Sequence, residues 1–319
     1  MTTETTQAGA AFKARTPEDL LAVVPAVLGF HPEESLVMLT FGGRRSFHAR
    51  VDLPPEPGHV PAVVDMLLTP ALRQRPDTVL FVAYSTDAAR ATATALHASD
   101  VFDAHGFAVI KPLRSDGTSW FHVSRDEDPA SAVPHPYDVS THALTAQTVL
   151  NGRVTLASRA AVAASIAADP VATEEVLQAW LAQLEGPAAD QAEVRGLIAA
   201  GLSGGAGLTD REVARLAHAC LDPAVRDAAW CDLRRETVET QLDFWRGVVV
   251  RTPDVLVAGV AAVLGFAAWL SGHGALAWCA VDRSFAADDE CSLARLVADL
   301  LQAAVPPTAW SDIAPAAQA

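Results

Sequence analysis

The residues best suited to chemistry lie in a loop between two apolar stretches, in the sequence "VPAVLGFHPEESLVMLT" of residues 24–40. An imidazole beside carboxylates is the usual setting of a general base, so this loop could supply an acid–base pair or an anion site. The candidate residues are His31, Glu33, Glu34 and Ser35. They are consecutive, however, and they precede a predicted strand, whereas α/β sheets usually bind ligands beyond the carboxyl ends of their strands. We therefore favour a structural turn over a functional site as the interpretation of this loop.

A second candidate site follows the apolar stretch "TVLFVAYS" of residues 78–85, which reads as a central strand. Between this strand and the next predicted helix stand the polar residues Tyr84, Ser85, Thr86 and Asp87. The N-terminus of that helix could hold an anion. The favoured alternative is that Thr86 or Asp87 simply caps the helix.

Arginines extend this anion-binding hypothesis. In "NGRVTLASR", Arg153 and Arg159 are the only Lys or Arg residues between positions 126 and 194. They could bind a phosphate group or bridge acidic helices to the sheet, and the sequence leaves both possibilities open. Arg50 and Asp52 alternate along another predicted strand and so face the same side of the sheet. We favour a cross-strand charge pair there over a pair that lines a groove.

No signature of a metal, a cofactor or a known catalytic apparatus is present. His122, His135 and His142 surround "RDED", but their spacing matches no recognised metal site. The glycine-rich, zinc-protease, nucleophile-elbow and kinase motifs are all missing, so we predict no catalytic residue, no metal and no cofactor. Four cysteines lack Cys-x-x-Cys spacing and are interpreted as buried, reduced thiols; they are Cys220, Cys231, Cys279 and Cys291.

The sequence pattern of the elements that must position these residues predicts a mixed α/β sheet followed by helices. A helix begins at Thr16 with Pro17 in its first turn, is kinked or divided at Pro25, and ends at Gly29. A strand hairpin, a helix, the central strand, a second helix and a second hairpin follow in order, which combines parallel and antiparallel pairing. The expected parts are a disordered tail (1–15), a mixed α/β domain (16–123), a loop (124–141) and an acidic α-helical domain (142–319).

Charge distinguishes the two halves. Residues 1–125 carry 11 Lys/Arg and 13 Asp/Glu, whereas residues 126–319 carry 12 and 25. Such an acidic half repels phosphate backbones and anionic membranes, so nucleic acid and membranes are unfavoured partners. The start of the chain lacks the pattern of a secretory signal. The apolar run from Val255 to Leu270 is short for a membrane span and is interpreted as a buried helix. These features favour a cytoplasmic protein.

Several phrases of the chain also resemble a known family. Taken in order, "LLAVVPAVLGFHPEESLVMLTFGG", "VLFVAYS", "NGRVTLASR" and "AAWLSGHGALAWCAVDRSFAADD" are similar to the actinobacterial family catalogued as domain of unknown function 4192. The resemblance implies no activity. Residues 265–290 are also similar to one tetratricopeptide-like helical hairpin. We predict an interaction or regulatory module with a protein partner; the alternative is a hydrolase or transferase that acts on a small phosphorylated metabolite at the ends of the strands.

Overall fold

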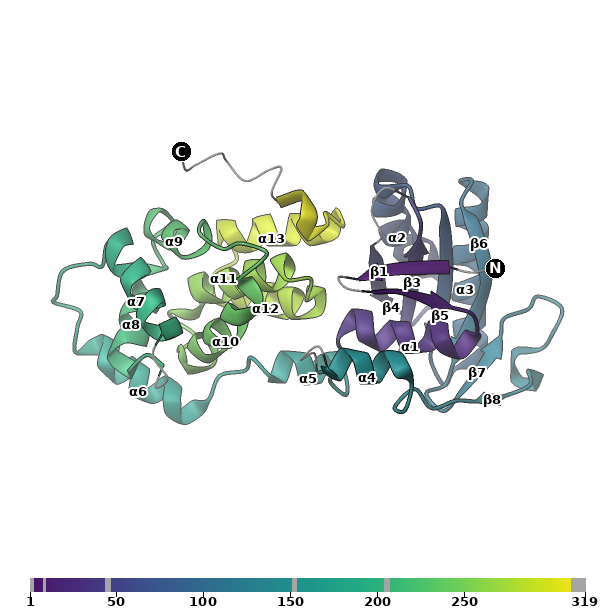
Figure 1. The fold of residues 1–319 in the computed structure, drawn as a ribbon, viewed down its shortest axis with the longest axis horizontal. Helices are drawn as coiled ribbons and strands as arrows, with labels where there is room; N and C mark the ends of the chain where they lie inside the picture. The colour runs from purple at the N-terminus through teal and green to yellow at the C-terminus, as the bar shows by residue number, and fades with distance from the viewer. Residues whose placement is uncertain (1–2, 8–9, 44–46, 151–153, 204–206, 311–319) are drawn as a thin grey trace. The chain divides into compact units, whose positions relative to one another are not determined.

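The protein, seen here in a computed structural model, consists of an N-terminal unit, Met1–Arg159, and a C-terminal unit, Ala160–Ala319 (Figure 1). The structure describes residues 3–7, 10–43, 47–150, 154–203 and 207–310. The division falls after Arg159 and not in the predicted loop at 124–141. That loop supplies a short strand to the sheet, and the helix after it packs on the first helix of the N-terminal unit.

The N-terminal unit is built on a mixed sheet, for which the described residues give six strands in the order β4-β3-β5-β6-β7-β8. The strands are β3 (Ser35–Phe41), β4 (His48–Asp52), β5 (Thr78–Tyr84), β6 (Ala108–Ser115), β7 (Ser119–His122) and β8 (His135–Pro136). Strands β5 and β6 are parallel, and the other neighbouring pairs are antiparallel. The predicted mixed sheet is therefore confirmed, with β5 in its interior.

Helices cover both faces of this sheet. They are α1 (Pro17–Leu28), α2 (Val60–Gln74), α3 (Ala88–Ala104) and α4 (Ala143–Leu150), with short 3-10 turns at Pro57–His59 and Pro129–Ser131. On one face, Leu21 and Val24 of α1 pack in one core with alternate residues of β3 and β5. On the other face, Phe81 of β5 meets Phe102 of α3, with ring centroids 4.9 Å apart.

Local sequence signals set the ends of α1. The Thr16 side chain accepts a hydrogen bond from the Asp19 N–H, and the Asp19 carboxylate accepts one from the Thr16 N–H, which is a reciprocal capping box. Gly29 ends the helix in the left-handed conformation with φ 79°. Pro25 lies inside the helix, which continues to Leu28 without dividing there.

Where a disordered tail was expected, β1 (Thr3–Gln7) pairs antiparallel with β2 (Ala10–Ala14). The threonine-rich sequence of β1 suits a strand, because β-branched side chains favour extended backbone. The turn at Arg44 and Arg45, and the central glycines of "SGGAG", lie outside the described residues.

The C-terminal unit is helical throughout its described regular elements. Its helices are α5 (Arg159–Ala164), which starts at the boundary, α6 (Pro170–Leu181), α7 (Gln191–Ser203), α8 (Asp210–Ala219), α9 (Pro223–Trp230), α10 (Leu242–Arg251), α11 (Val257–Leu270), α12 (Gly274–Ala287) and α13 (Ser292–Gln302). Short 3-10 turns lie at Val238–Gln241 and Pro307–Ala309. All residues of α11 are buried, which confirms the predicted buried helix. Across the described residues, every helix is too short or too polar to cross a membrane.

Helices α11 and α12 form the predicted hairpin around Gly272, whose φ is 83°. Its similarity to a tetratricopeptide unit stays a prediction. Helix α11 is the centre of this unit, in contact with α9, α10, α12 and α13. The C-terminal unit can therefore present surface helices on a firmly packed interior.

Candidate functional site

The opening loop and the end of the central strand meet at one edge of the sheet. Because β3 runs antiparallel to β5, Ser35 at the start of β3 pairs with Tyr84 at the end of β5. Tyr84 in turn pairs with Ser115 at the end of β6. The sequence-based argument against the loop treated a strand start and the carboxyl ends as opposite edges. The antiparallel pairing removes that argument, since it brings them to the same edge.

One residue from each predicted candidate set takes part in a hydrogen-bonded cluster at this edge. The Ser85 hydroxyl donates to both carboxylate oxygens of Glu34, at 2.9 and 3.1 Å. The Arg90 guanidinium donates to the same Glu34 carboxylate and to the Ser85 Oγ, the latter at 3.3 Å. Arg90 was not among the predicted site residues. Its position three residues beyond the cap Asp87 was the available signal, since i and i+3 are neighbours on a helix.

Backbone conformation directs Glu34 toward this cluster. Its φ is 42°, in the left-handed region that residues other than glycine seldom adopt. In this conformation its carbonyl accepts a hydrogen bond from the Leu53 N–H at 2.8 Å, which ties the loop to the end of β4. The carboxylate is half exposed, so the ion pair with Arg90 contributes on the order of 0–1 kcal/mol. The cluster therefore fixes the loop more than it stabilises the fold.

The capping interpretation of the β5–α3 turn agrees with the observed geometry. Asp87 accepts a hydrogen bond from the Arg90 N–H at 3.0 Å and is the N-cap of α3. Its own N–H donates to Ser85 Oγ at 3.0 Å. Thr86 is exposed, and Tyr84 is buried in the core beneath α1, where burial raises the pKa of its hydroxyl. The protein's own side chains thus occupy the N-terminus of α3, as the favoured capping interpretation predicted, in place of the anion that was considered there.

A second cluster lies on the α1 face of the same edge. Arg50 Nε donates to Ser35 Oγ at 2.8 Å, and its Nη2 lies 2.6 Å from an Asp52 carboxylate oxygen. A charge pair is therefore present, but it joins two residues of one strand and is not the cross-strand pair that was predicted. The Arg50 side chain is only 14% exposed, and loss of hydration lowers the pKa of its guanidinium. The negative charge of Asp52 raises this pKa, and the positive charge of Arg159 lowers it further. Arg159 therefore lies near Arg50.

The segment that carries Arg159 is joined to the opening loop by backbone hydrogen bonds. The Leu156 N–H donates to the Gly29 carbonyl at 2.8 Å, and the His31 N–H donates to the Leu156 carbonyl at 3.1 Å. The side chains of His31 and Glu33 are exposed. Arg153, also predicted for this site, lies outside the described residues. The structure thus brings the opening loop, the end of β5 and Arg159 to one edge of the sheet.

The three histidines considered for a metal do not converge. His142 Nε2 lies 3.0 Å from an Asp19 carboxylate oxygen. His135 stacks on Trp120 with a centroid distance of 4.2 Å, and His122 meets the same indole edge-on at 4.9 Å. Among the described residues there is no group of three or more His, Cys, Asp or Glu side chains arranged to hold a metal ion.

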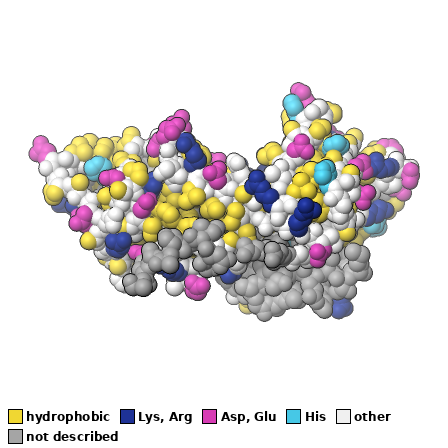
Figure 2. Space-filling model, turned by 90° about the horizontal axis from the view of Figure 1, so that it is seen from above, with side chains coloured by type: hydrophobic (Ala, Val, Ile, Leu, Met, Phe, Trp, Pro, Cys, Tyr) yellow, Lys and Arg dark blue, Asp and Glu magenta, His cyan; other side chains and the backbone are white. Residues whose placement is uncertain are grey.

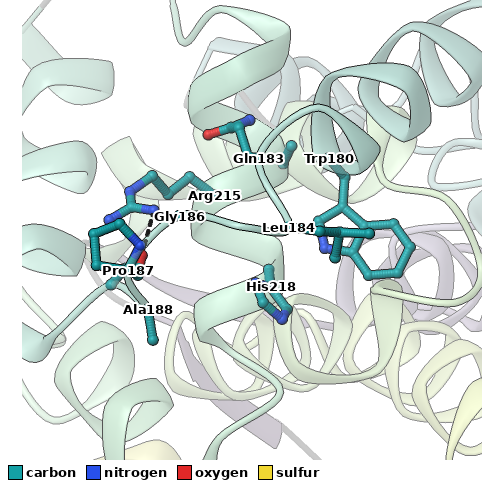
Figure 3. A pocket seen from close by; sticks show the side chains of 10 residues that line it. Trp180, Gln183, Leu184, Gly186, Pro187, Ala188, Arg215 and His218 are labelled. Atoms are coloured by element: carbon teal, nitrogen blue, oxygen red, sulfur yellow. Dashed lines mark hydrogen bonds between the residues drawn. The ribbon is translucent and has the colours of Figure 1, made fainter.

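A pocket that the sequence analysis missed lies in the C-terminal unit, between the end of α6, the loop after it and α8. Its volume is about 240 Å³ (Figure 3). Trp180 and Leu184 lie on one side, Pro187 and Arg215 on the other, with His218 between them. The ring centroids of Trp180 and His218 are 5.9 Å apart. These side chains come from positions 38 apart, so local patterns could not group them.

Arg215 holds one wall of this pocket in place. Its guanidinium forms two hydrogen bonds to the Glu193 carboxylate, one of them at 2.7 Å, and donates to the Pro187 carbonyl at 3.0 Å. The bond to Glu193 raises the pKa of Arg215 and lowers that of Glu193. Trp180 Nε1 is buried and has no acceptor among the described residues. One wall of the pocket therefore carries a neutralised cation, and in the other wall the indole N–H of Trp180 is buried beneath the surface without a partner among the described residues.

Together, the two units define a class of protein: a mixed α/β sheet with its polar cluster at one edge, followed by a helical unit with a small pocket. The sequence model of the family described as "Domain of unknown function (DUF4192)" matches residues 17–308, nearly the whole chain. The chain belongs to this family. Neither a curated protein nor a solved structure matches it.

Proposed function

We propose that this protein is a cytoplasmic interaction or regulatory module, and that its binding surface is the outer face of α6 with the loop that follows. One observation carries the proposal: apolar side chains on this helix and in the loop after it face water. Val171 is 69% exposed, Leu181 47% and Leu184 50%. Val171 and Leu181 share one face, because positions 171, 174, 178 and 181 follow the helical repeat.

The opposite side of α6 packs against its own unit. Val176 is the buried residue of α6, and it supports packing on α8 from the opposite side of the helix. Apolar side chains gathered on a surface and rimmed by polar residues commonly mark a protein-interaction site. On α6 the polar residues Glu174 and Gln178 lie between the two apolar positions of this face, and Glu175 lies beside them. Figure 2 shows a different face of the C-terminal unit, at the left, where apolar side chains also gather; α6 lies on the far side of that view.

The test compares two double variants of the full-length protein as bait in lysate of the native host. In Val171→Ser/Leu181→Ser the proposed surface loses its apolar groups; the matched control is Val255→Ser/Leu221→Ser, two other exposed positions of the same unit. A partner captured by the unaltered chain and by the control should be lost with the α6 variant. Capture of the same partner by all three proteins, or of none by any at any salt concentration, contradicts the proposal.

A second candidate function is an enzyme, a hydrolase or transferase, that binds a small phosphorylated metabolite at the sheet edge. It is favoured by one observation: the positive charges of Arg50 and Arg159 act on each other. The carboxylate paired with Arg50 is that of the exposed Asp52. Guanidinium groups bind phosphate by paired hydrogen bonds. Calorimetry with inorganic phosphate and phosphorylated sugars tests it. We expect millimolar binding that is lost in Arg50→Gln, and no heat in the unaltered protein refutes it.

A further inference from the structure

We propose that the pocket between α6 and α8 receives one large apolar side chain from a basic segment of the partner protein. This inference rests on the proposed function, since it specifies the chemistry of the partner that the α6 surface binds. The occupant is a short peptide segment with a Leu, Phe or Trp between Lys or Arg residues.

The size and walls of the pocket select a side chain over a whole small molecule. At about 240 Å³ the pocket is below the roughly 300–1,000 Å³ typical of small-molecule sites. Trp180, Leu184 and Pro187 supply apolar walls. Aromatic and aliphatic anchors that fill such pockets carry most of the binding energy of protein interfaces.

The cations at the pocket do not select an anion. The Arg215 guanidinium already donates hydrogen bonds to the Glu193 carboxylate and to the Pro187 carbonyl. The Gln183 amide donates to the carbonyls of Ala179 and Arg211. The Arg211 side chain is exposed on the first turn of α8, where Asp210 and Glu212 also lie. An anionic ligand would therefore have to compete with carboxylates already present.

Charge around the pocket selects a basic partner. Residues 160–194 contain six Asp/Glu and no Lys or Arg, and residues 169–215 contain eight Asp/Glu against three Arg. Glu185 and Asp190 lie in the same loop as the pocket-lining residues Leu184 and Ala189. Carboxylates placed around an apolar hollow attract Lys and Arg that flank an apolar anchor, and they raise the association rate at low salt.

The unpartnered indole N–H adds a polar contact for a peptide. A buried donor without an acceptor is unfavourable, because it has lost its hydrogen bond to water and gained none in the protein. Leu184 lies beside the Trp180 ring in Figure 3. When a peptide enters and Leu184 moves aside, a backbone carbonyl of the peptide can accept this hydrogen bond. A purely apolar ligand offers no such acceptor.

Fluorescence anisotropy with a labelled synthetic peptide, Lys-Arg-Ser-Trp-Ser-Arg-Lys, tests the inference on the full-length protein. Two peptides serve as controls: one replaces the central Trp by Ser, and the other replaces every Lys and Arg by Glu. We expect the parent peptide to bind at least about tenfold more tightly than either control, and its affinity to fall as salt rises.

Protein variants then locate the binding. Ala188→Trp should fill the pocket and weaken the parent peptide about tenfold or more, whereas Ala286→Trp, at an exposed position of α12, should leave binding unchanged. Neutralising Glu174, Glu175 and Glu185 to Gln should weaken binding without filling the pocket. The matched control neutralises three other exposed acids of the same unit, Glu236, Asp289 and Asp299. Thermal unfolding midpoints equal to that of the unaltered protein show that each variant is folded.

Each result decides between the two proposals. Equal binding of the anchorless peptide, or full affinity in Ala188→Trp and in the neutralised variant, overturns the pocket inference. If Val171→Ser/Leu181→Ser still loses the cellular partner in that case, the proposed function stands alone. If the peptide binds as expected but the cellular partner is kept by the α6 double variant, the pocket is a peptide site and the wider α6 surface is not the module's interface.

Discussion

Helix α11 passes so close to the end of α8 that Gly259 leaves no room for a methyl group. A Cβ atom at this position would lie 2.1 Å from the Cys220 carbonyl oxygen and 2.7 Å from its carbonyl carbon. Both atoms belong to the backbone, so no side-chain rotation can relieve the contact. Gly259→Ala must therefore displace α11 or the end of α8, the helix that carries Arg215 and His218 of the pocket.

The cost of this substitution follows from two opposing effects. Overpacking a buried site costs about 1–3 kcal/mol, and a clash with backbone belongs at the upper end of that range. Alanine has a higher helix propensity than glycine, and this difference stabilises the substituted helix by about 1 kcal/mol. The net loss in the free energy of unfolding is about 2 kcal/mol, which lowers the melting temperature of a unit of this size by roughly 4–8 °C.

Circular dichroism melts of Gly259→Ala and Gly265→Ala provide the assay and its matched control. Gly265 lies in the same helix, but a Cβ there would lie 3.4 Å from Val281 Cγ2 and 3.5 Å from the Ala277 carbonyl oxygen, which are ordinary contacts. Gly265→Ala should therefore gain up to about 1 kcal/mol. A Gly259→Ala protein that melts at or above the unaltered protein would refute the packing of α8 on α11 and the reasoning built on it.

Two further predictions concern titrating groups. Burial lowers the pKa of His48 to about 4, so the unfolded chain binds this proton first; the free energy of unfolding should fall by about 3 kcal/mol as pH drops from about 6.5 to 4. Urea titrations should show a smaller fall in His48→Gln, and an identical fall in both proteins contradicts the assignment. Burial raises the pKa of the Cys220 thiol to about 12, and Cys279 and Cys291 are also buried, so a thiol reagent at mildly alkaline pH should label only the exposed Cys231 in the folded protein. Rapid labelling of a second cysteine contradicts this.

Local signals explain why much of the fold was predictable. Thr16 with Asp19, and Thr209 with Glu212, cap their helices through residues three positions apart, so the sequence shows each cap directly. The continuous apolar run of β5 likewise marks an interior strand. The division into units was predicted less well. The polar composition of residues 124–141 indicates a loop but does not show that part of it pairs with β7.

The candidate site was only half predictable, for a physical reason. Glu34 and Ser85 were both named from the sequence, but as members of separate sites. Their hydrogen bond joins residues 51 apart, and it depends on the antiparallel pairing of β3 with β5. Arg90 was missed because a helix arginine near a cap is common and becomes informative only when its partner across the sheet edge is known.

By itself, the sequence determined most of the helices and the main strands, several caps and the acidic character of the C-terminal half, because these depend on neighbours along the chain. The tertiary structure alone decided which edge gathers the polar residues, and that Trp180 and His218 face one pocket. Strand direction and helix packing bring together residues far apart in sequence, and no local periodicity records that pairing. The proposed partner chemistry needed both, the charge from the sequence and the pocket from the fold.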